Sequence, residues 1–282
     1  MLSLLLVLSV GSAVLQNGIF NSVCKKSLKS DPDIYKFNLF VYAVCLLIFG
    51  ILTVGKHLSL YTVLLGMLFG IVTALGNLYK MAALSKGPMH ITLLITTSSM
   101  IIPTLSGVFF GEKFSLFKLL IALVLIYFIY LSIGKRKGEK INRSWSICCL
   151  IAFLLIGTVG VLQKIHQTSA HKSEISGFLF VSFLISAIIS AFKSKGKETL
   201  KMETRLIPLA LICGGCTFAM NYINLKLSGL LPSQLFFPLV NGSSIVLSSV
   251  LSVVLFREHL STRQTMGLIG GILSLIGICL VP

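Results

Sequence analysis

Apolar residues gather along this chain in runs that are separated by short polar stretches. Most of the runs approach the ~20 residues that a helix needs to cross the hydrocarbon core of a bilayer. Ten runs can be distinguished, at residues 2–24, 34–54, 60–84, 88–110, 116–133, 146–165, 176–192, 206–225, 232–256 and 265–281. The pattern predicts an all-α integral membrane protein with ten transmembrane helices.

The second half of the chain repeats features of the first half in the same order. The sequence GEKFS at 111–115 joins the fourth and fifth runs, and REHLS at 257–261 joins the ninth and tenth. Asn77 in the third run and Asn221 in the eighth each precede, by the same spacing, the proline that opens the next run. A pattern that recurs at half the chain length indicates a duplicated helical unit.

We therefore expect two repeats of five helices each, residues 1–137 and 138–282. Because five is an odd number, the second repeat must enter the membrane in the opposite sense to the first. Inverted repeats of this kind, related by a pseudo-two-fold axis in the membrane plane, are typical of secondary transporters.

The composition supports a membrane environment. The chain is 55% hydrophobic and 11% charged, with a mean hydropathy of +0.97, whereas a soluble protein carries about 25% charged residues. The net charge of +16 comes from Lys and Arg residues in short loops, not from a basic helix face. This distribution argues against a nucleic-acid partner and favours membrane lipid as the partner.

Of the 24 Lys and Arg residues, most lie on or beside odd-numbered loops. By the positive-inside rule, this predicts that the odd-numbered loops are cytoplasmic and that both termini are external.

The two loop sequences, the five-plus-five arrangement and the Gly-rich tail 267–281 resemble the EamA-like branch of the drug/metabolite transporter superfamily. The resemblance implies ten helices, inverted halves and a central cavity lined mainly by spans 1, 3, 4, 6, 8 and 9. It implies a multi-pass protein of the bacterial plasma membrane. It also implies cytoplasmic termini, contrary to the charge distribution, so the direction of transport stays open.

The eight acidic residues all lie in predicted loops or at helix ends. A charge in the middle of a membrane usually marks an ion or proton relay, so its absence argues against antiport through an embedded carboxylate. No nucleophile triad, metal motif or phosphate loop is present, and we expect no enzyme, no catalytic residue, no cofactor and no metal. Cys213 and Cys216 have the spacing of a metal pair but lack a second pair. Glu112 and Glu258 suit either a gate or helix-capping role or that of an interfacial acid at the start of the next helix, and we favour the interfacial acid because each lies just before a span.

Uncharged polar residues concentrate in spans 1, 3, 4, 6, 8 and 9. Each of them suits either an interhelical hydrogen bond or a solute-binding cavity, and their concentration in these spans favours the cavity. The predicted substrate-binding residues are Gln16, Asn17, Asn21, Asn77, Tyr79, Thr97, Ser98, Gln163, Lys164, Asn221, Asn241 and Ser243. For Lys164, snorkelling to the interface is the favoured interpretation; a position facing the cavity instead favours an anionic solute.

Two further features concern movement and packing. Pro103 and Pro238 lie inside spans four and nine, where each removes a backbone hydrogen bond and produces either a hinge or a static kink. The stripes Gly66-x-x-x-Gly70 and Gly267-x-x-x-Gly271 allow close helix packing. The second stripe suits either a homodimer face or intramolecular packing, and we favour the latter.

These observations predict a secondary transporter that moves a small polar organic metabolite, such as an amino acid or a sugar, by alternating access. The solute is expected to be neutral, zwitterionic or anionic, since no buried carboxylate is available to pair a cation. Two alternatives stay open: a non-transporting membrane subunit or scaffold, and a lipid flippase.

Overall fold

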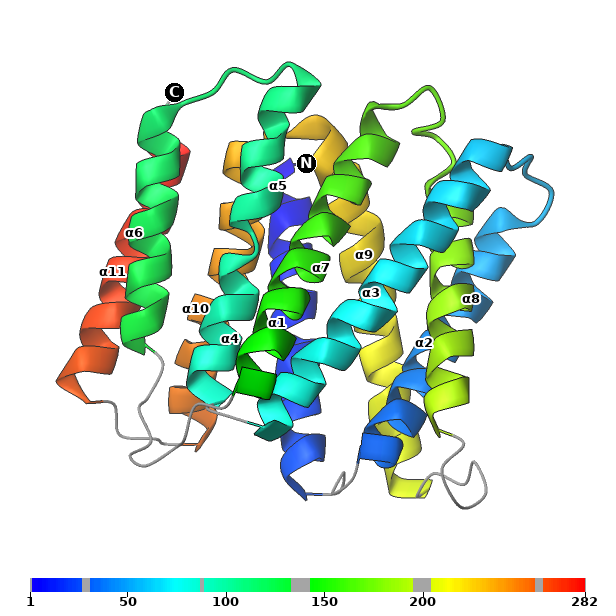
Figure 1. Cartoon of the computed structure of the whole chain (residues 1–282), viewed down its shortest axis with the longest axis horizontal. Coiled ribbons are helices and arrows are strands. Elements are labelled where there is room, and N and C mark those ends of the chain that lie inside the picture. The colour runs from blue at the N-terminus through cyan, green and yellow to red at the C-terminus, as the bar shows by residue number, and fades with distance from the viewer. Residues whose placement is uncertain are drawn as a thin grey trace. The chain divides into compact units, whose positions relative to one another are not determined.

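The structure is a computed structural model of the chain, and it describes residues 2–26, 31–86, 89–132, 143–194, 204–256 and 261–281. All regular secondary structure in these residues is helical (Figure 1). The first half contributes α1 (Leu2–Lys26), α2 (Asp31–Thr53), α3 (Leu60–Lys86), α4 (Met89–Ser98), α5 (Ile101–Ser106), the 3-10 helix η1 (Gly107–Phe110) and α6 (Leu116–Ser132). The second half contributes α7 (Arg143–Thr168), α8 (Ile175–Ser194), the 3-10 helix η2 (Thr204–Leu206), α9 (Ile207–Leu230), α10 (Ser233–Phe256) and α11 (Thr262–Leu280).

Helical segments lie at every predicted apolar run. Among the described residues, 7 helices are long and apolar enough to cross a membrane by themselves: α1, α2, α3, α7, α8, α9 and α11. The predicted seventh run, 176–192, is one of the two shortest, and it becomes the 20-residue helix α8. Glu258 and half of the odd-loop Lys and Arg residues lie outside the described ranges, so the predicted orientation stays a prediction.

The fourth predicted span is broken near its middle. Pro103 has no N–H to donate to Ser99, and the Ser99 carbonyl accepts from Ile102 instead, at 3.0 Å. Met100 N–H likewise donates to Thr97 at 3.1 Å, so a tight turn separates α4 from α5. Pro238, by contrast, lies inside the continuous helix α10. The two prolines therefore differ in their effect on the backbone, and a hinge role for either stays a prediction.

The chain divides into two compact units. Unit 1 comprises Met1–Ala74 and His166–Leu227, and unit 2 comprises Leu75–Ile165 and Ser228–Pro282. Each unit thus combines segments from the first and second halves of the sequence.

Unit 1 is held together largely by α8. Helices α2 and α8 are antiparallel neighbours, with the rings of Phe49 and Phe183 stacked at 5.8 Å. Helix α3 packs on α8 through its glycine stripe, because a Cβ on Gly66 would lie 2.9 Å from the Phe178 carbonyl oxygen. Gly70 approaches the next turn of the same backbone. A side chain larger than hydrogen at either position would force the two helices apart.

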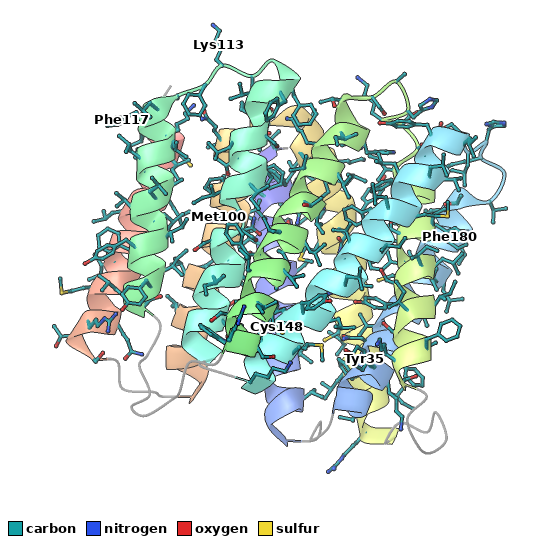
Figure 2. All side chains as sticks on the ribbon, viewed as in Figure 1. Tyr35, Met100, Lys113, Phe117, Cys148 and Phe180 are labelled. Atoms are coloured by element: carbon teal, nitrogen blue, oxygen red, sulfur yellow. The ribbon has the colours of Figure 1, made fainter. Side chains whose placement is uncertain are left out.

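Unit 2 contains a second antiparallel pair, α6 and α11, which lie side by side (Figure 1). Gly267 faces the backbone at the end of α6, and Gly270 faces the ring of Phe128. The Gly267 stripe therefore packs within the molecule. Phe117, on the first turn of α6, points away from the neighbouring helices and is exposed, as a lipid-facing side chain would be (Figure 2).

Candidate functional site

Polar side chains join α1 to α9 within unit 1. The Gln16 amide donates to Thr217 Oγ1 at 2.7 Å, and Ser9 donates to the Asn224 side-chain oxygen. The half-buried Asn221 donates to the Thr217 carbonyl at 2.8 Å. Among the predicted site residues, Gln16 and Asn221 thus take part in hydrogen bonds within the protein, and Thr217 is the residue that links them.

Sequence reasoning missed Ser9 and Thr217 as members of this group. A signal was available, because Ser9 lies two helical turns before Gln16 and Thr217 lies one turn before Asn221, so each shares a face with a predicted residue. Asn17 is exposed, and the side chain of Asn21 lies outside the described residues. The structure therefore brings together part of the predicted α1 and α9 set.

The predicted residues of unit 2 are more dispersed. Tyr79 packs against a buried cluster that includes Trp145 and Cys149. This cluster is polar at one edge, where Trp145 Nε1 donates to Thr92 Oγ1 at 2.9 Å. The other predicted residues of the unit range from buried to exposed: Gln163 is buried, Asn77, Thr97, Ser98 and Ser243 are half-buried, and Asn241 is exposed.

The most densely connected polar group of unit 2 surrounds Glu112. Lys164 Nζ lies 2.5 Å from Glu112 Oε1, and the two side chains are only 6% and 15% exposed. Lys164 also donates to the carbonyls of Ser228 and Leu231 at 2.8 and 3.1 Å, at the C-terminal end of α9. Glu112 accepts from the Ser233 backbone N–H at 2.6 Å, at the first residue of α10. Each charge thus lies at the helix end whose dipole it complements.

Further contacts in this group join the same two turns. Ser115 N–H donates to the Gln234 side-chain oxygen at 2.9 Å, and Ser233 Oγ donates to Glu112 Oε1 at 3.1 Å. Gly107 makes room for the carboxylate, because a Cβ there would collide with Glu112 Oε2. We refer to Glu112, Ser115, Lys164, Ser233 and Gln234 as the Glu112 cluster.

Two expectations about this cluster are corrected by the structure. The expectation that Lys164 snorkels to the interface is wrong, because its ammonium is buried in an ion pair. An ammonium has three N–H donors, and three acceptors surround that of Lys164. A role of Lys164 in substrate binding stays a prediction. Glu112 does cap a helix, but the helix is α10 and not the span that follows Glu112 in the sequence.

A comparable group lies in unit 1 around Glu174, in the turn between α7 and α8. Glu174 Oε2 accepts from both the backbone N–H and the hydroxyl of Ser59, each at 2.9 Å, just before α3 begins. His171 Nδ1 lies 3.0 Å from Glu174 Oε1. Burial tends to raise the pKa of the Glu174 carboxyl, but hydrogen bonds from Ser59, Thr62 and His171 together lower this pKa to about 2. We refer to Ser59, Thr62, His171 and Glu174 as the Glu174 cluster.

The surroundings of the Glu174 cluster hold the same two turns together. Lys56 Nζ donates to Ser176 Oγ at 3.4 Å, and Ser176 donates to the Leu52 carbonyl at 3.3 Å, near the end of α2. The rings of Tyr61 and His171 are stacked at 5.4 Å. Sequence reasoning treated Glu174 only as a loop acid, and the missed signal is the Ser59-x-x-Thr62 pattern at a helix start.

The chemistry available to these groups is that of hydrogen bonding and ion pairing. In the part of the chain that the structure describes, no three His, Cys, Asp or Glu residues gather as a metal site would require. Cys213 is buried, and the adjacent Gly214 packs closely against Val44 of α2. The cysteine pair thus occupies a helix-packing surface.

Comparisons with known proteins bear on the fold and the family. One solved crystal structure, described only as that of a protein, is similar with a TM-score of 0.73 over 99% of this chain and 99% of its own. At 16% identity this likeness shows a shared fold alone. No curated protein matches the chain. Residues 143–281 match the sequence model of the EamA-like transporter family. Residues 143–281 thus resemble the EamA-like transporter family, in agreement with the drug/metabolite transporter superfamily, and the long apolar helices are those of a multi-pass integral membrane protein.

Proposed function

We propose that this protein is a secondary transporter that moves a small polar organic metabolite across the bacterial plasma membrane by alternating access. The observation that carries the proposal is the family match over residues 143–281. The polar residues of α1, α3, α4, α7, α9 and α10 are the proposed solute ligands, because their amides and hydroxyls can exchange internal hydrogen bonds for bonds to a solute.

The packing within each unit supports the inverted-repeat arrangement that such a transporter uses. In unit 1 the antiparallel pair α2 and α8 corresponds to spans two and seven, which are equivalent positions of the two predicted halves. In unit 2 the pair α6 and α11 corresponds to spans five and ten, again equivalent positions. A two-fold axis that relates inverted halves would bring equivalent helices into antiparallel contact in this way.

The solute can be found with a thermal-shift screen of the purified protein against amino acids, sugars and related metabolites, since a ligand that binds the folded state raises its apparent stability. We expect the stabilising solute to be taken up by, or released from, vesicles that contain the protein.

Asn221→Leu and Asn241→Leu should abolish this flux while leaving the amount of folded protein unchanged. Leu211→Ala and Leu247→Ala, at exposed apolar positions of α9 and α10, are matched controls that should retain it. Flux that survives both asparagine changes would remove these residues from the site, and vesicles inert to every stabilising solute would refute transport.

A further inference from the structure

The Glu112 cluster is an unusual way to close two turns of a membrane protein. An interfacial turn can leave its charges in water at little cost, yet here a carboxylate and an ammonium are both withdrawn from solvent. Burial of an ion pair costs desolvation free energy that the mutual attraction only partly offsets, so such pairs are weak evidence for stability. Their better-attested use is to specify one arrangement out of several.

The arrangement specified here joins three separate segments. Glu112 lies in the turn after η1, Lys164 lies near the end of α7, and both bind the turn that links α9 to α10. The contacts are made to the carbonyl at Ser228, near the end of α9, and to the N–H at Ser233, at the start of α10. Separation of the pair would therefore release the ends of α9 and α10 at the same moment.

We propose that the Glu112 cluster is a conformational latch. Its ion pair holds the α9–α10 turn against the α5–α6 turn and α7, and when the pair separates, the two turns move as one cooperative unit. The use of this opening in the transport cycle rests on the proposed function, since alternating access requires such a movement.

The proposal is tested by hydrogen exchange on the full chain in lipid nanodiscs, without any solute. The pH is chosen so that amide exchange is faster than reclosing of the opened turns. Peptides covering 111–116 and 229–236 should then exchange together. They should exchange earlier than peptides covering 122–129 of α6 and 268–275 of α11. Glu112→Gln should accelerate exchange at both turns by about tenfold or more, and by a clearly larger factor than in the α6 and α11 peptides. Glu174→Gln, the same substitution in unit 1, is the matched control and should not affect the peptides of unit 2.

Two outcomes would overturn the latch. One is unchanged exchange at both turns in Glu112→Gln, and the other is an increase spread evenly over unit 2, as for a pair that merely adds stability. Should Glu112→Gln fail to fold, Ser233→Ala removes one hydroxyl contact of the cluster and must accelerate the same two peptides by a smaller factor. Because the measurement needs no substrate, its failure is distinct from a failure of the transport assay, which would refute the function alone.

Discussion

Unit 1 and unit 2 each use a glutamate from one turn to hold the first residues of a helix that follows another turn. In unit 1 Glu174 accepts from Ser59 before α3, and in unit 2 Glu112 accepts from Ser233 at the start of α10. Both carboxylates replace the missing hydrogen-bond acceptors of a helix N-terminus. The two clusters are thus alike in the contacts that their carboxylates make to the backbone.

The clusters differ in the side chain that faces the carboxylate. Glu112 faces a lysine whose side chain is 6% exposed, whereas Glu174 faces a histidine whose side chain is 39% exposed. A buried charge that loses its partner is destabilising by several kcal/mol, while a solvated pair contributes little. Loss of the partner side chain is therefore expected to destabilise unit 2 more than unit 1.

Lys164→Met should have the largest effect. The change leaves the Glu112 carboxylate buried without its counter-charge and removes the donor to two carbonyls of the α9 end. We expect a loss of about 3–5 kcal/mol in the free energy of unfolding, measured by unfolding in mixed detergent micelles.

The double variant Lys164→Met with Glu112→Leu is the informative control for this change. It removes both buried charges, so it should recover much of the stability that the single variant loses. A double variant less stable than Lys164→Met would contradict the view that an unpaired charge causes the loss.

Glu174→Gln should have an intermediate effect. The amide oxygen can still accept from Ser59, but the charge that strengthens these hydrogen bonds is lost, at a cost of about 1–3 kcal/mol. The folded-state pKa of about 2 lies below the ordinary value of 4.5. The stabilisation by this carboxyl is therefore complete above about pH 4.5 and is lost as the pH falls from 4.5 towards 2.

The measurement for Glu174→Gln is the melting temperature of the detergent-solubilised protein across that pH range. The natural protein should lose stability on acidification more steeply than the variant does. The two curves should converge near the acid end, because protonation makes the natural carboxyl neutral as well. Parallel curves throughout would show that Glu174 is not held in its ionised form by Ser59 and His171.

The helices could be predicted from the sequence because the bilayer sets their length and their apolar character. A hinge or kink at Pro103 could be predicted from its missing N–H, but Pro238 lacks the same group inside a continuous helix, so the break itself could not. The pairing of the turns could not: nothing near Glu112 in the sequence distinguishes capping of α6 from capping of α10. For Lys164, snorkelling and ion pairing look the same in the sequence, and only the fold places Glu112 within reach.

In the candidate site, too, local sequence patterns predict some residues, whereas the contacts between them depend on the tertiary structure. Gln16 and Asn221 could be selected because amides are rare in apolar runs and need partners when buried. Their link through Thr217 depends on how α1 and α9 face each other, which no local pattern specifies.

His171→Gln should have the smallest effect and is the sharpest test of the contrast between the two clusters. The imidazole is 39% exposed, so water and salt screen its attraction to Glu174, and the carboxylate keeps both donors of Ser59. We expect a loss of about 0.2–1 kcal/mol in the free energy of unfolding, shrinking further as salt is raised. Tyr61→Leu, which removes the ring stacked on His171, separates ring packing from electrostatics, because its effect should not depend on salt. A salt-independent loss in His171→Gln as large as that in Lys164→Met would mean that exposure does not distinguish the two partner side chains, and the contrast between the two clusters would then have no basis.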